Sequence, residues 1–516
     1  MKNLWFAACI LIIAACSTPK NETIQYGKFE DPLASTFDPA LKPFYHGVAS
    51  GDPLNDAVII WTKVTPEDSI PTLTGQWEVA TDQGFSTIIK SGDFSTGLES
   101  NYTVKIDVTG LKANTSYFYR FTYNDQYSPI GRTKTAPSGD VDSLKFVVIS
   151  CSNYEAGFFN AYGRIGELTD IDVVIHLGDY IYEYGKGVYG DTTTGRFHQP
   201  PHEIISLLDY RTRYAQYRLD KDLQSAHQNH PFITIWDDHE IANDSYKDGA
   251  QNHQEGEGSY DVRRETARKV YYEWMPVREN PTLYRSFSYG DMADLIMMDE
   301  RLEGRTAPVE SVEAENIADD SRSMLGEKQL TWFKERLSTS DAKWKIIGNQ
   351  VIFSYLNWGW PSFKINLDSW DGYPGERAKI IDFIKSNNVE NIVFVTGDTH
   401  SSWALEVTDD PFGSYEKEGA IATEFGTTSI NSSNSDERSS KEIVVEHEKK
   451  IVNSPINPQL KYANLRDHGY LELALFPDKA RARWYYVGTV TQPVESISLG
   501  MEKYVPVGEN VINDEL

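Results

Sequence analysis

Side chains that can bind metal ions or transfer protons follow five apolar segments of the chain. Cys151 ends "LKFVVIS", and "HLGDYIYEY" places Asp179 and Tyr182 directly after another such segment. Polar groups at the ends of neighbouring strands gather at one edge of an α/β sheet, and acidic residues gathered there are expected to bind metal ions. The members of this predicted site are Cys151, Asp179, Tyr182, Asp238, His239, Asn349, Gln350, Asp398 and His400.

The segments that end in these residues belong to an alternating pattern of strands and helices that begins near residue 144. Apolar stretches such as "DVVIHL" and "NIVFVT" predict buried strands, and "SYDVRRETARKVYYEWM" and "GERAKIIDFIKSN" predict helices. Such alternation is typical of a layered α/β fold in which both faces of the sheet are covered. The polar stretches 243–260 and 405–460 are expected to be surface excursions.

Residues 44–137 have a different pattern, with apolar side chains at every second position. In "TSYFYRFTY", Tyr117, Tyr119, Phe121 and Tyr123 share one face, and turns rich in Gly, Asp and Asn separate such segments. This pattern predicts a small all-β sandwich, and "LKANTSYFYRF" resembles a fibronectin type III module around its tyrosine corner. The sandwich contains no group of candidate ligands, so a structural or docking role is expected.

The N-terminus has the features of an export signal. Residues 1–15 hold a lysine, an apolar stretch too short to span a bilayer, and small residues before Cys16. The end of this stretch resembles a bacterial lipobox, which implies cleavage before Cys16, lipidation of its thiol and a tether over residues 16–43. A plain secretory peptide is the alternative. In either case the protein is exported, and the lipid would anchor it to a bacterial membrane, the outer membrane being favoured, facing periplasm or cell surface.

Cys151 is the single thiol expected in the mature body, because Cys9 is lost with the signal and Cys16 carries the lipid. No intrachain disulfide can then form. An unpaired thiol in an oxidising compartment needs a reason to be there. Cys151 is therefore either a ligand at the strand end or a small buried apolar residue.

The formal charge of the 516-residue chain is −27, which argues against tight binding of nucleic acid. It does not exclude a small phosphorylated substrate, provided that metal ions reverse the local field. A serine hydrolase is poorly supported, because the sequence has no Gly-x-Ser-x-Gly elbow.

Several of these motifs resemble those of the calcineurin-like metallophosphoesterases, with the usual metal motifs altered. The set "SCSN", "HLGDYIYEY", "WDDHE", "WKIIGNQV", "WDGYPGER" and "TGDTHSSWALE" is closely similar to the alkaline phosphatase D (PhoD) family, and "FYHGVASGDPLNDAVIIWTKV" to the entry into its N-terminal domain. The resemblance covers residues 44 to about 490. It implies a metallophosphoesterase-type domain at 144–495 after the β domain at 44–137. Residues 496–516 are an acidic tail that is expected either to cover the site or to hang free.

The resemblance implies a first metal ion bound by Cys151, Asp179, Tyr182 and His400. Tyr182 lies three residues after Asp179, as in the iron-binding motif of purple acid phosphatases, and a thiolate and a phenolate are strong anionic donors. The implied ion is Fe(III).

The matching second metal site contains oxygen donors in this sequence, namely Asp238, Asn349 or Gln350, and Asp398. Hard oxygen ligands suit Ca(II) better than zinc, and the family pairs iron with calcium, so one or two calcium ions are implied. Asp179 would bridge both metals. The alternative is that Asp179 and Asp398 only cap helices or turns.

His239 stands where the superfamily has its catalytic histidine, so it would contact the substrate phosphate or protonate the leaving oxygen. Alternatively, it orients Asp238 through a hydrogen bond.

Arg301 is the preferred phosphate ligand because a guanidinium can hold two oxygens, although a surface salt bridge is equally compatible. Asp237, Glu240 and Asn243 are further candidates for binding calcium or supporting ligands. His176, inside "VVIHL", is expected to be a core histidine.

The function implied is hydrolysis of phosphomonoesters or phosphodiesters by a metal-activated water outside the cytoplasm. The expected partners are a small phosphate ester and, through the lipid, a membrane. The competing interpretation is a non-enzymatic surface lipoprotein that binds a glycan or protein through the β-sandwich.

Overall fold

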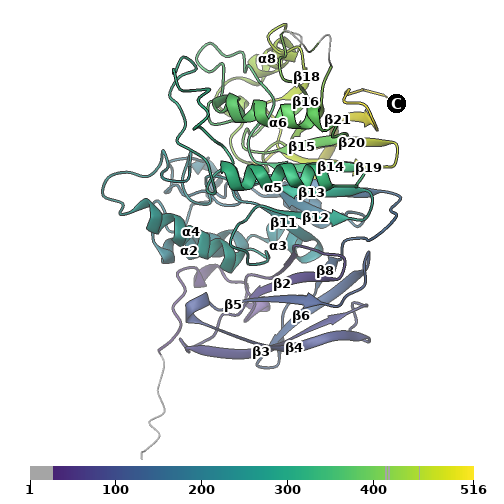
Figure 1. Cartoon of the computed structure of the whole chain (residues 1–516). Helices are drawn as coiled ribbons and strands as arrows, with labels where there is room; N and C mark the ends of the chain where they lie inside the picture. The colour runs from purple at the N-terminus through teal and green to yellow at the C-terminus, as the bar shows by residue number, and fades with distance from the viewer. Residues whose placement is uncertain (1–26, 413–414, 416–418, 453, 516) are drawn as a thin grey trace, which may run out of the picture.

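The computed structural model describes residues 27–515, apart from 413–414, 416–418 and 453. The predicted signal peptide and Cys16 lie outside the described residues. Within the described part, no helix combines the length and apolar character needed to span a membrane. In Figure 1 an all-β region, drawn in purple and blue, lies below a larger α/β region drawn in teal to yellow. The predicted fold class is therefore confirmed.

One sheet of the α/β region has the strand order β21-β20-β19-β9-β10-β11-β1-β2-β5. Strands β9, β10, β11 and β1 run parallel, and the remaining pairs are antiparallel. The strands are β1 (Val48–Gly51), β2 (Ala57–Lys63), β5 (Thr103–Thr109), β9 (Leu144–Ile149), β10 (Val173–His176), β11 (Pro231–Thr234), β19 (Gly469–Leu475), β20 (Lys479–Val487) and β21 (Ile497–Pro506).

A second sheet has the order β12-β13-β14-β15-β17-β16-β18, with β13, β14, β15 and β17 parallel. Its strands are β12 (Arg285–Tyr289), β13 (Ala293–Met297), β14 (Trp344–Asn349), β15 (Ile392–Thr396), β16 (Ser402–Val407), β17 (Ala422–Gly426) and β18 (Leu460–Asn464).

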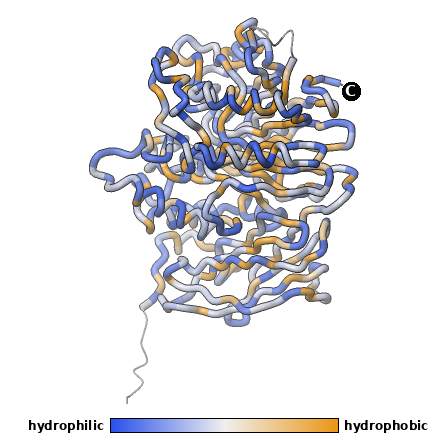
Figure 2. Tube along the Cα trace, viewed as in Figure 1, coloured by the Kyte–Doolittle hydropathy of each residue, from blue (hydrophilic) through white to orange (hydrophobic). Residues whose placement is uncertain are grey.

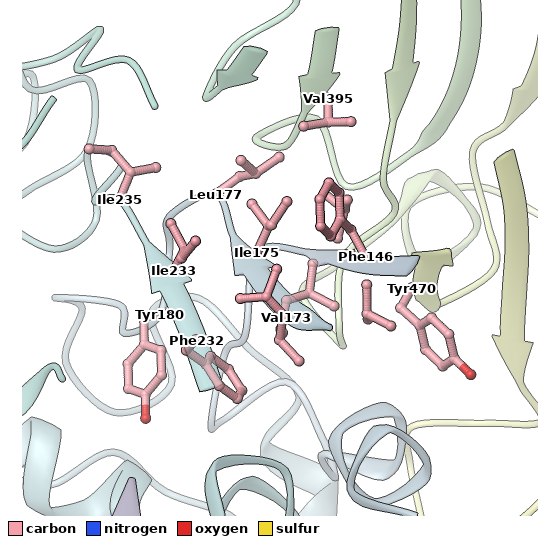
Figure 3. Close-up of a cluster of buried hydrophobic side chains, with 14 of the residues drawn as sticks. Phe146, Val173, Ile175, Leu177, Tyr180, Phe232, Ile233, Ile235, Val395 and Tyr470 are labelled. Atoms are coloured by element: carbon pink, nitrogen blue, oxygen red, sulfur yellow. The ribbon is translucent and has the colours of Figure 1, made fainter. Parts of the chain in front are cut away.

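The main core lies between these two sheets. Along β15, Val393 and Val395 belong to the core shared with the first sheet, whereas Ile392 and Phe394 belong to a second core. Figure 3 shows Leu177, after β10, pointing toward Val395. Because successive side chains of a strand point to opposite faces, a strand buried on both faces is expected to be apolar, as the first four residues of β15 are. Figure 2 shows the apolar residues concentrated inside.

Helices cover the outer faces of both sheets. Helices α5 and α6 pack Phe333, Leu337, Ile380 and Ile384 against the second sheet, and α1 and α3 bury Ile165 and Leu223 in the core of the first. The helices are α1 (Asn160–Gly166), α2 (Leu207–Arg218), α3 (Lys221–Asn229), α4 (Tyr260–Trp274), α5 (Gly326–Thr339), α6 (Pro374–Ser386) and α8 (Lys441–Val452), with short 3-10 turns η1 (Ala34–Thr36), η2 (Pro39–Leu41), η3 (Leu98–Ser100), η4 (Thr192–Thr194), η5 (Trp370–Gly372) and η6 (Ser435–Glu437).

The all-β region continues directly into the first sheet. A third sheet, β4-β3-β6-β7 with β8 paired to β6, shares a core with β2 and β5. Strand β1 in turn pairs parallel with β11, so that the sandwich and the α/β region share one hydrogen-bonded sheet. The strands of this third sheet are β3 (Thr72–Ala80), β4 (Ile88–Gly97), β6 (Ser116–Tyr123), β7 (Gln126–Tyr127) and β8 (Gly131–Lys134).

Two segments differ from their expected description. The stretch 405–460 was predicted to be a surface excursion, but it contains β17, which is buried within the second sheet. Its polar Glu424 is tolerated because the carboxylate accepts hydrogen bonds from Phe353 N, Ser354 N and Thr396 Oγ1. Residues 497–506 of the acidic tail form β21, the edge strand of the first sheet.

His176 is a buried core histidine, as predicted. Its Nε2 lies 2.8 Å from the hydroxyl of Tyr162, and Gly178 N donates to its Nδ1. With a donor facing Nδ1, the ring has no acceptor for a second proton. Burial accordingly lowers the pKa of His176 to about 3, and burial together with Arg132 lowers that of His230 to about 3.

We expect stability to fall as the pH drops below neutrality. An unfolded histidine titrates near pH ~6.5, so between there and pH 3 the unfolded chain binds more protons, and each such ring lowers the free energy of unfolding by about 1.4 kcal/mol per pH unit. Thermal unfolding midpoints between pH 7.5 and 5 measure this slope. His176→Gln should make it shallower, whereas His202→Gln, at an exposed side chain, should not; identical slopes in all three proteins would contradict the assignment.

Candidate metal centre

The predicted site residues lie where parallel strands of both sheets end. Cys151 and Asp179 follow β9 and β10 of the first sheet, and Asp398 and His400 follow β15 of the second. The segment after β17 joins the two sheets at this edge, because Ile430 N donates to Ser150 O at 3.0 Å. The two sheets thus bring together residues that are far apart in sequence.

The backbone at these positions is strained. Cys151, Asp179, Asp398 and His400 have φ angles of 60°, 55°, 61° and 55°, in the left-handed region that costs an L-residue roughly 1–2 kcal/mol. Gly178, with φ 105°, cannot be replaced simply, since a Cβ there would lie 2.4 Å from Asp237 N. Strain of this kind is typical of sites where side-chain direction matters more than local stability.

The structure brings together the four predicted ligands of the first metal. The ligand atoms of Cys151, Asp179 and His400 all lie within 4.8 Å of one another. The Tyr182 hydroxyl oxygen is 3.1 Å from both Asp179 Oδ2 and His400 Nε2. A single phenol proton lies among these acceptors, and Asp179 Oδ1 is buried without a partner among the described residues. A bound cation would satisfy this set of donors.

Neighbouring hydrogen bonds fix the direction of two of these ligands. Nδ1 of His400 lies 2.8 Å from the carbonyl oxygen of Ser433, which accepts the Nδ1 proton and leaves the Nε2 lone pair facing the cluster. Ser432 Oγ donates to the Tyr182 oxygen at 2.7 Å. A histidine oriented by a carbonyl in this way is the usual arrangement of a metal ligand.

Burial opposes ionisation of the cluster. Burial, and then repulsion from Asp179, raises the pKa of the Cys151 thiol, and the same two causes raise that of Tyr182. Burial also raises the pKa of Asp179. Three acidic groups packed together in a dry site ionise only beside a strong positive charge, so the donor set fits a highly charged cation.

A second acidic cluster adjoins the first. Ligand atoms of Asp237, Asp238 and Asp398 lie within 4.8 Å of one another, and so do those of Asp179, Asp238 and His239. Asp238 belongs to both groups, and Asp179 takes part in the first cluster as well. The geometry is therefore compatible with a carboxylate shared between two metal ions.

Arg301 lies inside this second cluster and is fully buried, which excludes a surface salt bridge. Its Nε donates to Asp237, its Nη1 to Asp368 Oδ2 at 2.6 Å, and its Nη2 to Asp398 Oδ1 at 3.1 Å. Arg305 also binds Asp368. The contact of Arg301 with a substrate phosphate stays a prediction.

Three charged residues near the second cluster, Asp368, Asp244 and Arg305, were not predicted from the sequence. Asp368 stands two residues before the quoted "WDGYP", and Arg305 four residues after Arg301. Asp244, whose N–H donates to Asp238 Oδ2, has a pKa raised to about 7 by burial and by the neighbouring carboxylates. The feature of the sequence that could have indicated these three residues is that each lies within a few positions of a recognised motif.

At the end of β14, Asn349 and Gln350 use their amides within the protein. Asn349 Nδ2 donates to Val351 O, and its Oδ1 accepts from Trp370 Nε1 at 3.3 Å. Gln350 Nε2 donates to Trp236 O and Met298 O, while its Oε1 is buried without a partner among the described residues. Both remain predicted ligands of the second metal.

His239 is held by a buried carboxylate that the sequence did not single out. Its Nδ1 lies 2.7 Å from Glu183 Oε2, and the other Glu183 oxygen accepts from Asn243 N and Asn252 Nδ2. Burial disfavours the charged ring, yet Asp238, Glu183 and Asp179 together raise the pKa of His239 well above its usual value. The His239 ring is therefore favoured in its protonated form, and because Nδ1 bonds to Glu183, the Nε2 proton can face the site.

Glu240 holds the backbone of the site together and is not in either acidic cluster. Its carboxylate accepts the N–H of Asp179 at 3.0 Å, of Asp237 at 2.7 Å and of Tyr180 at 2.5 Å. Since these residues follow β10 and β11, Glu240 fixes the two loops relative to each other. Its role is positioning.

Glu240→Gln should weaken metal binding by about 10–100-fold, because the new amide N–H₂ would face a backbone donor and shift Asp179. Metal content after dialysis against a weak chelator measures this. Glu376→Gln is the matched control, since Glu376 accepts Met324 N and Leu325 N far from the clusters. Equal metal content in the two variants would refute the positioning role.

Comparisons with known proteins agree with this geometry. The family model of the PhoD-like phosphatases matches residues 146–484, and that of the PhoD-like phosphatase N-terminal domain matches residues 32–137. The chain is 35% identical over 504 residues to alkaline phosphatase D of Bacillus subtilis (strain 168), covering 92% of this chain and 82% of that protein. It matches a solved structure of PhoD with a TM-score of 0.80 at 33% identity, over 92% of each chain. The chain therefore belongs to the PhoD-like phosphatase family and is a metal-dependent hydrolase of phosphate esters.

Proposed function

We propose that this enzyme is exported and hydrolyses phosphomonoesters, phosphodiesters or both with water as the attacking group. Fe(III) is assigned to Cys151, Asp179, Tyr182 and His400. The observation that carries this assignment is the convergence of a buried thiol, phenol, carboxylate and imidazole, with 3.1 Å from the Tyr182 oxygen to two of its partners. Family membership does not favour the alternative of a non-enzymatic surface lipoprotein.

Ca(II), as one or two ions, is assigned to the second cluster, with Asp238, Asn349 and Asp398 as ligands, Gln350 as the other amide candidate and Asp179 shared. Carboxylate and amide oxygens suit this hard cation. When bound, the two kinds of metal ion supply positive charge that neutralises phosphoryl oxygens and makes a water molecule more acidic.

His239 is proposed as the general acid. Glu183 accepts the Nδ1 proton, so Nε2 of the charged ring carries the proton that passes to the leaving oxygen. Glu183 also keeps the ring in place through its bonds to Asn243 and Asn252. Arg301 offers Nη2, which lies between Asp238 and Asp398, to the phosphoryl oxygens.

The proposed location rests on the sequence. Cleavage before Cys16 and lipidation of its thiol would anchor the enzyme to a bacterial membrane, the outer membrane being favoured, with the tether holding the folded body in the periplasm or at the cell surface. The charge of −27 suits a protein held in solution beside that membrane and matches a substrate bound through metal ions.

Removal of metal should abolish activity. A strong chelator is expected to stop hydrolysis of 4-nitrophenyl phosphate, and Fe(III) and Ca(II) added together should restore it, whereas either ion alone or zinc should not. Elemental analysis of the restored enzyme identifies the bound ions. Full activity in the presence of the chelator would contradict the proposal.

The iron assignment predicts a coloured protein, because a thiolate or phenolate bound to Fe(III) gives a charge-transfer band. Tyr182→Phe and Cys151→Ala should each shift or remove this band and lower metal content. Tyr189→Phe is the matched control, since its ring lies 5.7 Å from that of Tyr182 but its hydroxyl is not in the cluster. A visible spectrum that survives both ligand substitutions would refute the ligand set.

A further inference from the structure

A pocket of about 530 Å³ opens beside His400. One wall is aromatic and comes from Trp358, Trp360 and Phe363, in the loop between β14 and η5. His400 and Tyr189 also line the pocket, together with Arg438 and several serines. His400 therefore belongs both to the pocket lining and to the first metal cluster, and the ligand assignments above leave the aromatic wall of the pocket without a role.

The aromatic wall is a tight hairpin. Phe363 N donates to Trp360 O at 3.2 Å and Trp358 N donates to Lys364 O at 2.8 Å, with Pro361 in the turn. Helix α8 holds the hairpin from outside, because the His447 ring stacks on Trp360 with 3.5 Å between ring centroids and its Nε2 lies 2.7 Å from Trp358 O. The wall is therefore preorganised and needs no ordering when a ligand binds.

The wall is also fixed relative to the metal cluster. Trp358 packs edge-on against Trp403, and Trp403 Nε1 donates to Thr399 Oγ1 at 2.9 Å. Thr399 directly precedes His400. Phe363 packs against Trp358 yet stays 43% exposed, so its ring offers a free apolar surface to the pocket.

Arg438 supplies positive charge to the pocket lining. Its side chain is exposed, and among the described residues its guanidinium has no hydrogen bond and no ion pair. In a chain of net charge −27, most arginines near the site are paired with carboxylates, as Arg301 and Arg305 are. An unpaired guanidinium beside an aromatic wall suits an anionic ligand that carries a ring.

We propose that this pocket binds the alcohol part of the substrate and selects phosphate esters whose alcohol is a ring with an apolar face, either an aromatic ring or a sugar. The ring stacks on Phe363 and Trp360, and Arg438 attracts the anionic ester. This inference rests on the proposed function, since it places the scissile phosphate at the metal cluster that His400 belongs to.

Non-hydrolysable phosphonates test the pocket without the differing reactivity of leaving groups. Titration calorimetry should show that benzylphosphonate or a glucosyl C-phosphonate binds the metal-loaded enzyme more tightly than propylphosphonate, by about 3- to 10-fold for one stacked ring. Benzyl preference alone would identify an aromatic ring, and glucosyl preference alone a sugar. Equal affinity for all three would overturn the proposal.

Phe363→Ala should remove the preference for ring phosphonates and leave the propyl compound unaffected, whereas Phe412→Ala, at a 61% exposed phenylalanine outside the pocket, should change neither. Arg438→Gln should weaken the binding of all three phosphonates and reduce the salt dependence of that binding. Arg438→Lys, which keeps the positive charge, should retain part of the affinity and of its salt dependence. Persistence of the ring preference in Phe363→Ala would overturn the proposal.

Unchanged metal content and unfolding temperature confirm that each variant is folded. A metal-loaded wild-type enzyme that hydrolyses no phosphate ester would refute the proposed function. An active enzyme without ring preference would refute only the pocket assignment.

Discussion

The structure depends on the concentration of acidic groups in a buried space between the ends of two sheets. Among the described residues, no lysine or arginine forms an ion pair with Asp179, whereas Arg301 forms ion pairs with Asp237, Asp238 and Asp398 of the second cluster. The two clusters therefore differ in their need for cations. The second is partly neutralised by Arg301. In the first, burial raises the pKa values of Cys151, Tyr182 and Asp179 and only His239 opposes this at Asp179, so a cation from outside would favour ionisation of its ligands.

Where the strands end, the carboxylates of buried glutamates accept backbone N–H groups that would otherwise be paired within a sheet. Glu240, Glu300 and Glu424 each accept two or more backbone N–H groups from loops beyond the strands, and Glu183 accepts one. A loop buried between two sheets has donors that neither sheet nor water can satisfy, and a carboxylate can satisfy several at once. The bond to Glu240 holds left-handed Asp179 in a conformation that its local sequence disfavours, and Cys151, also left-handed, donates its N–H to Gly178 O.

The sequence predicted those parts of the fold and site that depend on local pattern. Strands such as β10 and β15 are mostly apolar because both faces are buried, and the chemistry-bearing residues follow them closely. β17 was missed because "ATEFG" is short and polar, and its burial depends on distant donors to Glu424. Asp368 was missed because its partner Arg301 is 67 residues away, and no local pattern records such a pair.

The first metal cluster draws its ligands from both sheets, with Cys151 and Asp179 on one and His400 on the other. A cation that binds this arrangement and not the unfolded chain stabilises the packing of the sheets against each other, in proportion to the logarithm of its concentration over its dissociation constant. Without the cation, Asp179 opposes that packing, because its raised pKa reflects the unfavourable burial of a carboxylate. Metal binding and the docking of the two sheets are therefore one equilibrium, and the strain of the left-handed ligands is stored in a native state that the metal completes.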